Sequence, residues 1–406
     1  MSFNSKFWLK FSLINLFIVA LIGLLMRYKI GFEFPYFDQK SLQHSHSHFA
    51  FSGWISQTLM VFMTAYLIQK SNSTVDFKKY NYILAANLIC SYGMLVSFIL
   101  QGYGAFSIGF SSASIIVSFV FAYCYTKDLK LLAATDLSKK WFTAALFFNV
   151  ISSFGTFFLV YMLVSKTIHE EEYLASLFFY LHFQYNGWFF FACMGLFYGF
   201  LNLKRADHSF FETTFYLFFI SCLPAYFLST LWANLPIWLY VVTILAAVLQ
   251  VVAWFTFLNL IVRTQKVSLA KLPYFLRYIL LFIVFAVSVK VLLQLGSTLP
   301  TVSKLTFGFR PIVIAYLHLV LLAIISLFLL FYMYANELIH CTNKIKVGVI
   351  IFSVGVLINE VILAVQGIAS FSYTVIPCVN ELLFGTAIVL VSGIGLTALY
   401  TVLKTK

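Results

Sequence analysis

Three histidines recur at a nearly constant spacing inside apolar stretches of the sequence. His48, His182 and His318 are 134 and 136 residues apart. Segments 48–54 and 182–188 share His, Phe, an aromatic residue, Gly and Trp in the same register. Neutral imidazole is a common axial ligand of haem iron, and two histidines on facing helices can hold a porphyrin within a helical bundle. The three histidines are therefore candidate axial ligands of a haem held between two helices, and interhelical hydrogen bonding by His48 and His318 is the structural alternative.

More histidines precede the second apolar stretch than one haem requires. His44, His46 and His48 alternate with serines, and in an extended loop such residues share a face. His44 and His46, together with His182, are therefore candidate ligands of copper or zinc. The simpler alternatives are a solvated loop for the cluster and an interhelical hydrogen bond for His182, worth about 0.6 kcal/mol on average.

Charged and amide side chains are predicted in the same layer as the histidines. Lys290 and Arg310 are expected to pair with haem propionates. A charge in hydrocarbon costs about 2.5–3.5 kcal/mol on insertion scales, so such residues usually face a bundle interior and mark a site. A structural ion pair between Lys290 and Glu360 remains the alternative. The other polar residues of this layer are Gln294, Asn380 and Glu381.

The composition excludes a soluble protein. Apolar residues make up 62% of the 406 residues and charged residues 10%, against about 25% charged in a soluble domain. Apolar runs long enough to cross a bilayer, which takes about 20 residues, follow one another along the chain. They are too long for barrel strands, so we expect an all-α polytopic membrane protein. The predicted spans are 8–26, 47–69, 82–101, 105–126, 141–165, 175–203, 212–232, 236–262, 274–296, 311–336, 346–370 and 378–403.

The histidine repeat groups these twelve predicted transmembrane helices into three pseudo-symmetric four-helix arcs. Residues 1–406 are expected to form one integral membrane domain with quasi-repeats near 1–135, 136–270 and 271–406. Each arc places a histidine on its second helix, about 10 Å or less from the outer face at 1.5 Å per residue.

Lysine and arginine predict the orientation of the chain. One set of alternate connections with both termini holds 19 of the 26 basic residues, and the other set holds 6. Because cytoplasmic loops accumulate these residues, both termini are expected in the cytoplasm of a bacterial-type inner membrane. The net charge of +13 therefore reflects topology rather than a nucleic-acid partner.

These residues resemble the haem-copper oxidase subunit I superfamily, including its NnrS-type relatives, over essentially the whole chain. The resemblance implies that His318 and either His48 or His46 are axial ligands of a low-spin haem. The His46-x-His48 pair with Gly53 five residues later is similar to the opening of the NnrS type.

The catalytic half of that family pattern is missing. Tyr316 stands where the oxidases carry the histidine ligand of the oxygen-reactive haem. Ser221 and Cys222 lie on the helix that carries adjacent copper ligands in the oxidases, and Asn186 occupies the place of a redox tyrosine. Oxygen reduction at a haem-copper centre is therefore not expected.

The leading hypothesis is an inner-membrane haem b protein with an electron-transfer, gas-sensing, respiratory or nitric-oxide-related role. Besides the lipid bilayer, its expected partners are cytochrome c, quinol or other respiratory subunits. The alternatives are a haem-free transporter, a copper- or metal-handling protein and a structural subunit of a respiratory complex.

Overall fold

The computed structural model describes residues 3–71, 77–201, 203–303 and 309–403. These residues contain helices and no strand, and they form two compact units. The first unit combines Met1–Leu132 with Ser326–Lys406, and the second is Ala133–Ile325. Three basic residues counted in the charge asymmetry lie outside the described residues: Lys304, Lys404 and Lys406.

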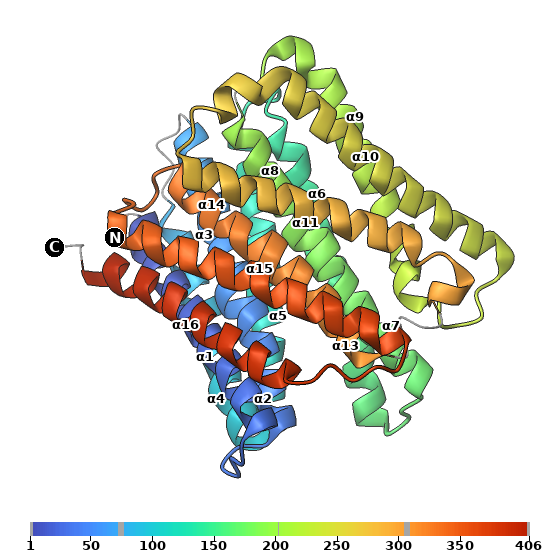
Figure 1. Ribbon diagram of the computed structural model, residues 1–406. Coiled ribbons are helices and arrows are strands. Elements are labelled where there is room, and N and C mark those ends of the chain that lie inside the picture. The colour runs from blue at the N-terminus through green and yellow to red at the C-terminus, as the bar shows by residue number, and fades with distance from the viewer. Residues whose placement is uncertain (1–2, 72–76, 202, 304–308, 404–406) are drawn as a thin grey trace. The chain divides into compact units, whose positions relative to one another are not determined.

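The first unit is built around the helix that carries the histidine cluster. α1 packs against α2, α3 and α16, while α4 packs against α2 and α5; α15 and α16 lie side by side (Figure 1). The elements are α1 (Ser5–Gly31), α2 (Gln39–Phe49), η1 (Ala50–Ser56), α3 (Gln57–Lys70), α4 (Lys78–Gln101), α5 (Ala105–Asp128), η2 (Leu129–Leu131), α14 (Leu327–Ala335), α15 (Asn343–Phe371) and α16 (Val379–Leu403).

In the second unit, α6 packs along α7, η3 and α8, while α10 packs against both α9 and α11. The elements are α6 (Ser138–Ser165), α7 (Glu170–His182), η3 (Phe183–Phe189), α8 (Phe190–Phe200), η4 (Arg205–Asp207), α9 (His208–Cys222), η5 (Pro224–Thr230), α10 (Ile237–Leu269), α11 (Tyr274–Gly296), α13 (Arg310–His318) and η6 (Leu319–Ser326), whose last residue belongs to the first unit.

The protein is a polytopic membrane protein. Among the described residues, ten helices are long and apolar enough to cross a membrane. An eleventh span is possible if α9 and η5 are taken together, although they are bent by 45° at Pro224. The predicted sixth span, 175–203, lies largely in the continuous helix α7–η3–α8, whose polar middle makes it less apolar than the ten. Twelve membrane-spanning helices therefore remain a prediction.

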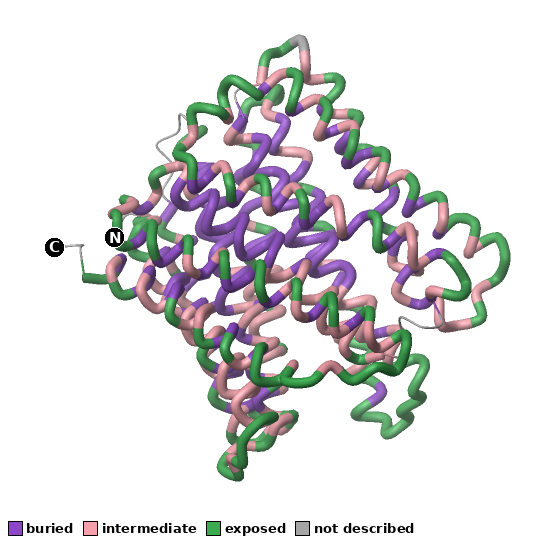
Figure 2. The backbone as a smooth tube through the Cα atoms, viewed as in Figure 1, coloured by how far each residue is buried: buried purple, intermediate pink, exposed green. Residues whose placement is uncertain are grey.

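Burial distinguishes inner from outer helices. In the span Gln39–Lys70, 78% of the residues in the most apolar 18-residue stretch are buried. The corresponding share is 17% for the span that contains α5. Every residue from His182 to Tyr198 is also buried. Figure 2 shows the corresponding alternation of buried and exposed residues along the outer helices.

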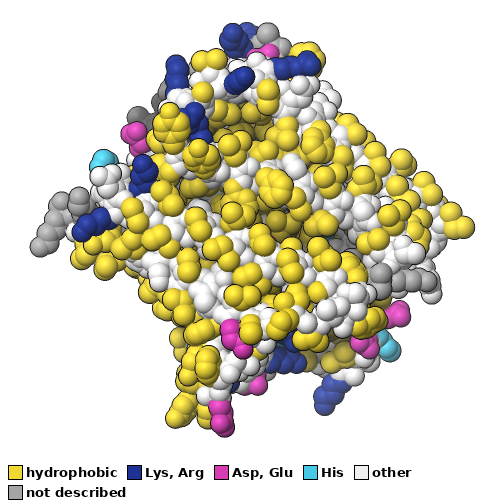
Figure 3. Space-filling model, viewed as in Figure 1, with side chains coloured by type: hydrophobic (Ala, Val, Ile, Leu, Met, Phe, Trp, Pro, Cys, Tyr) yellow, Lys and Arg dark blue, Asp and Glu magenta, His cyan; other side chains and the backbone are white. Residues whose placement is uncertain are grey.

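The face in Figure 3 is covered mainly by apolar side chains, with charged side chains near helix ends, as expected for a lipid-facing surface.

The segment before the second predicted span is helical, so the expected extended loop at the histidine cluster is wrong. Asp38 caps α2 by accepting a hydrogen bond from the Ser41 N–H at 2.8 Å. This cap starts the helix eight residues before the predicted boundary at residue 47. At 3.6 residues per turn, His44 and His48 share a face, whereas His46 lies on the opposite side.

Three π-helical segments interrupt the helices that carry the three repeated histidines. η1 begins two residues after His48, η3 directly after His182 and η6 directly after His318. π-helical turns are rare and occur frequently at functional sites. The histidine repeat seen in the sequence is therefore accompanied by a repeated backbone feature.

Candidate functional site

Asparagine side chains satisfy the backbone of the first π segment. Asn15 on α1 donates to the Gly53 carbonyl oxygen at 2.5 Å, and Asn87 on α4 donates to the Ser52 carbonyl oxygen at 3.0 Å. Tyr92 in turn donates to Asn15 Oδ1 at 2.7 Å. The Gln57 N–H also donates to the Ser52 carbonyl oxygen, so Asn87 is a second donor to that oxygen, and Asn15 adds a donor at Gly53.

Side chains of α6 form hydrogen bonds with the second π segment, η3. Gln184 donates to Asn149 Oδ1 at 3.1 Å and to Ser152 Oγ at 2.7 Å. Asn149 lies 33 residues before His182, and Asn15 lies 33 residues before His48. The sequence analysis did not use this shared spacing, which is the signal that could have identified both asparagines.

The histidines of α2 have two different surroundings. His48 stacks on Phe98, with ring centroids 4.4 Å apart, and its Nε2 lies 3.5 Å from the Tyr103 hydroxyl. The His44 ring meets Tyr103 edge to face at 4.6 Å. His46 instead faces α1, where its Cε1 lies 3.4 Å from the position that a Cβ on Gly23 would occupy. The three histidines do not converge on one point.

His182 is held by hydrogen bonds on both ring nitrogens. Its Nε2–H donates to the Cys222 carbonyl oxygen at 2.9 Å, and its Nδ1 accepts from Asn186 Nδ2 at 3.2 Å. The first bond requires a proton on Nε2, and the second requires a lone pair on Nδ1. His182 is therefore a neutral imidazole with both nitrogens engaged by the protein, as in the structural alternative considered above.

His318 forms a hydrogen bond to the backbone of its own helix. Its Nδ1–H donates to the Ile314 carbonyl oxygen of the same helix at 2.9 Å. This bond places the lone pair of the neutral ring on Nε2. A backbone acceptor on the other ring nitrogen is the usual arrangement around a metal-ligating histidine.

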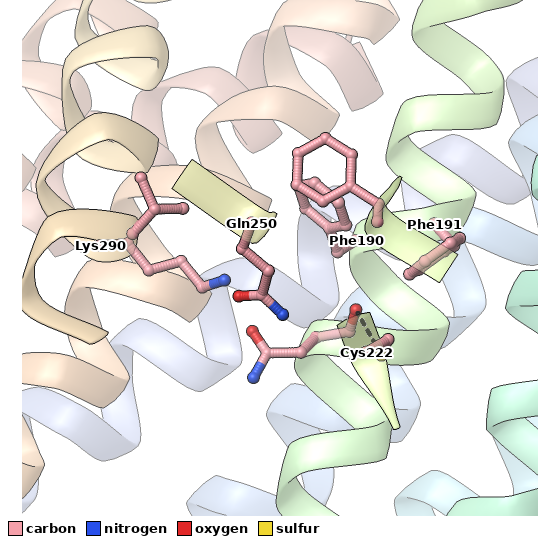
Figure 4. Close-up of a pocket in the computed structure, with 8 residues that line it drawn as sticks. Phe190, Phe191, Cys222, Gln250 and Lys290 are labelled. Carbon is pink, nitrogen blue, oxygen red and sulfur yellow. Dashed lines mark hydrogen bonds between the residues drawn. The ribbon is translucent and has the colours of Figure 1, made fainter. Parts of the chain in front are cut away.

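Lys290 lies inside the second unit, beside a small cavity. The side chain is 6% exposed, and its Nζ lies 5.6 Å from the centre of the Phe190 ring. Figure 4 shows it extending from α11 towards the amide of Gln250 on α10. A cation over an aromatic ring gains about 0.5–2 kcal/mol, less than the roughly 2.5–3.5 kcal/mol that the buried charge costs.

The cavity is lined by residues of η3, α8, α9, α10 and α11 in the second unit. Its volume is about 10 Å³, close to the smallest space that holds one water molecule. Gln250 is 5% exposed, and its Oε1 has no hydrogen-bond partner among the described residues. The lining residues are Asn186, Phe190, Phe191, Phe218, Cys222, Gln250, Lys290 and Val291.

Other polar residues predicted to share the site have separate surroundings. Arg310 is exposed at the first residue of α13. Gln294 lies one turn after Lys290 on α11, and its buried Oε1 has no partner among the described residues. In the first unit, Asn359 donates to Glu360 Oε1 at 3.2 Å, and Glu381 is exposed in the first turn of α16.

No family model matches the sequence, and no curated protein is similar to it. In addition, the described residues contain no group of three or more His, Cys, Asp or Glu side chains placed to hold a metal ion. The candidate site therefore has to be judged from its own geometry.

The sequence did not single out all of the residues that shape these sites. Cys222 was noted only as a departure from a family pattern, whereas its carbonyl group binds His182. Gln250 was not noted at all, although it is a polar residue within a long apolar run, a signal of the kind that identified Lys290.

Proposed function

We propose that this protein binds one haem b in the membrane, with His318 and a histidine of α2 as axial ligands, and that it transfers electrons. The observation that carries the proposal is the hydrogen bond from His318 Nδ1 to the Ile314 carbonyl oxygen. It fixes the tautomer in which Nε2 can ligate iron, and it orients the ring. The π segments that follow the repeated histidines support a specialised role for these positions.

The surroundings of α2 favour His46 as the second ligand. His48 is stacked on Phe98, and its Nε2 faces the Tyr103 hydroxyl, so ligation through that nitrogen requires both contacts to rearrange. His46 faces Gly23 on α1 instead, and its Cε1 lies 3.4 Å from the position that a Cβ on Gly23 would occupy. We therefore assign the second ligand to His46 and regard His48 as part of the aromatic contact between α2 and α4.

The remaining residues are assigned roles that follow from their positions. Bound haem supplies one-electron redox chemistry. Arg310, exposed at the start of α13, is suited to pair with a propionate. The cavity beside Lys290 is too small for a carboxylate attached to a porphyrin, so we do not assign a propionate to Lys290. His182 is not assigned to iron, because both of its ring nitrogens already have protein partners. Its hydrogen bond to the Cys222 carbonyl oxygen stabilises the chain where α9 ends.

The direct test is a pyridine haemochrome assay of full-length protein purified after expression in a haem-replete host. We expect about one haem b per chain and an α-band near 560 nm in the reduced-minus-oxidised spectrum, which is typical of b-type haem. His318→Ala and His46→Ala should each lower the haem content several-fold, while His48→Ala should retain it. Wild-type protein without haem overturns the proposal. Loss of haem in His48→Ala but not in His46→Ala overturns only the choice of ligand.

A haem-free transporter is the second candidate function, favoured by the buried Lys290 beside Gln250. Transporter sites usually lie near the membrane midplane at broken helices, and the second unit has a break between α9 and η5. Metal analysis separates the two functions. About one iron per chain supports the haem protein. A protein that contains no metal but transports a solute into vesicles supports the transporter.

A further inference from the structure

The interior of the second unit holds a lysine, Lys290, that forms no ion pair among the described residues. The unit has six acidic residues, which lie before or within the first two turns of α6, α7 and α9: Asp136, Glu170, Glu171, Glu172, Asp207 and Glu212. Glu212 pairs with Lys140 at 3.1 Å. Among the described residues, Lys290 has no ion pair and no hydrogen bond.

A second polar side chain faces the same cavity without a partner. Gln250 is more than nine-tenths buried, and its amide makes no hydrogen bond among the described residues. Because both orientations of the amide are open to it, Gln250 can present either its oxygen or its NH₂ group to a ligand. Lys290 and Gln250 together therefore offer an ammonium group and an amide donor to one enclosed point (Figure 4).

We propose that this cavity is a binding site for a small monovalent inorganic anion. A buried cation is stabilised when an opposite charge accepts its hydrogen bonds, and nearby acidic side chains do not supply that charge. An anion here accepts N–H donors from Lys290 and from Gln250. The Phe190 and Phe191 rings and the thiol of Cys222 close the apolar side of the site.

The size of the cavity limits the class of ligand. A volume of about 10 Å³ is near the lower limit for a single water-sized group, so an organic carboxylate is excluded and the ligand is at most a single-atom anion such as a halide, around which the side chains adjust. The site is independent of the proposed haem, since none of its lining residues is a proposed iron ligand. The two proposals can therefore fail separately.

Chloride is the probe for this site. Equilibrium binding of radioactive chloride to the purified full-length protein should saturate at about one ion per chain. Bromide should compete with it, whereas gluconate should not. In a thermal melt at constant ionic strength, replacing gluconate with chloride at about ten times its dissociation constant should raise the unfolding temperature by about 2–4 °C.

Substitutions assign the binding to the cavity. Lys290→Met should weaken chloride binding at least tenfold, and Gln250→Leu, which keeps the cation, should weaken it several-fold. Lys271→Met is the matched control, because Lys271 is exposed in the turn between α10 and α11. His318→Ala should bind chloride as the wild type does, whether or not it retains haem.

Three outcomes overturn the proposal. They are the absence of saturable chloride binding to the wild type, unchanged binding in Lys290→Met, and equal losses in Lys290→Met and Lys271→Met. If Lys290→Met does not fold, Gln250→Leu decides, since unchanged binding in that variant also contradicts the site.

Discussion

Nε2 of His182 lies 2.9 Å from the carbonyl oxygen of Cys222, the last residue of α9. This oxygen needs a partner because the chain leaves the α-helix there. The Tyr226 N–H, which would reach this oxygen in a continuous α-helix, bonds to Leu223 instead. The histidine on α7 therefore satisfies a backbone group that a broken helix exposes inside the bundle.

Replacing His182 with Ala should destabilise the protein by about 1–3 kcal/mol, because a buried carbonyl oxygen loses its donor. Thermal or denaturant unfolding of the detergent-solubilised protein measures the loss. His182→Gln, which keeps an N–H donor, should recover part of it. Haem content should not change, and a variant that loses iron while keeping its stability would identify His182 as a ligand instead.

Gly187→Ala should destabilise the second unit by about 1–3 kcal/mol through overpacking. A Cβ at this position would lie 2.5 Å from the Cβ of Phe148 on α6, with no flexible end to move aside. Gly109→Ala is the control, since nothing lies within 4 Å of a Cβ there and alanine favours a helix. Equal unfolding temperatures for the two variants would show that η3 does not pack against α6 in this way.

Asn15→Ala should also destabilise the protein, by roughly 1–3 kcal/mol for each buried group left without its partner. The variant removes the donor to the Gly53 carbonyl and the acceptor of the Tyr92 hydroxyl. Asn343→Ala, at an exposed position on α15, should change little. The comparison is made by unfolding in detergent, and a similar small effect at both positions would argue against a supporting role for Asn15.

Reporter fusions check the predicted orientation. A fluorescent protein fused after residue 406 should fluoresce, because the basic residues place this end in the cytoplasm. Alkaline phosphatase inserted between α1 and α2 should be active, since that connection is expected on the outer side. Phosphatase activity at the carboxyl terminus, without fluorescence, would reverse the orientation.

Most of the helical architecture could be predicted from the sequence. The ends of α11 and the start of α5 fall at the predicted residues, because apolar runs and polar interruptions are local properties of the chain. The start of α2 was missed, since its helix contains serines and histidines rather than an apolar run. The Asp38 cap was the available signal.

The candidate site was predictable only in part. The histidine repeat and the position of Lys290 within an apolar run are visible in the sequence. The partners of those residues are not, because they come from helices far away along the chain. His182 bonds to a carbonyl group 40 residues later, and Asn15 to one 38 residues later.

The sequence by itself determined a helical membrane protein and the positions of its unusual polar residues, because hydropathy and charge act locally and continuously along a chain in lipid. Tertiary structure decided what those residues do. It turned His46 away from His48, engaged both nitrogens of His182, and placed Lys290 beside a small cavity. These contacts depend on the pitch of a helix and on the side chains packed against it, so spacing along the sequence could not predict them.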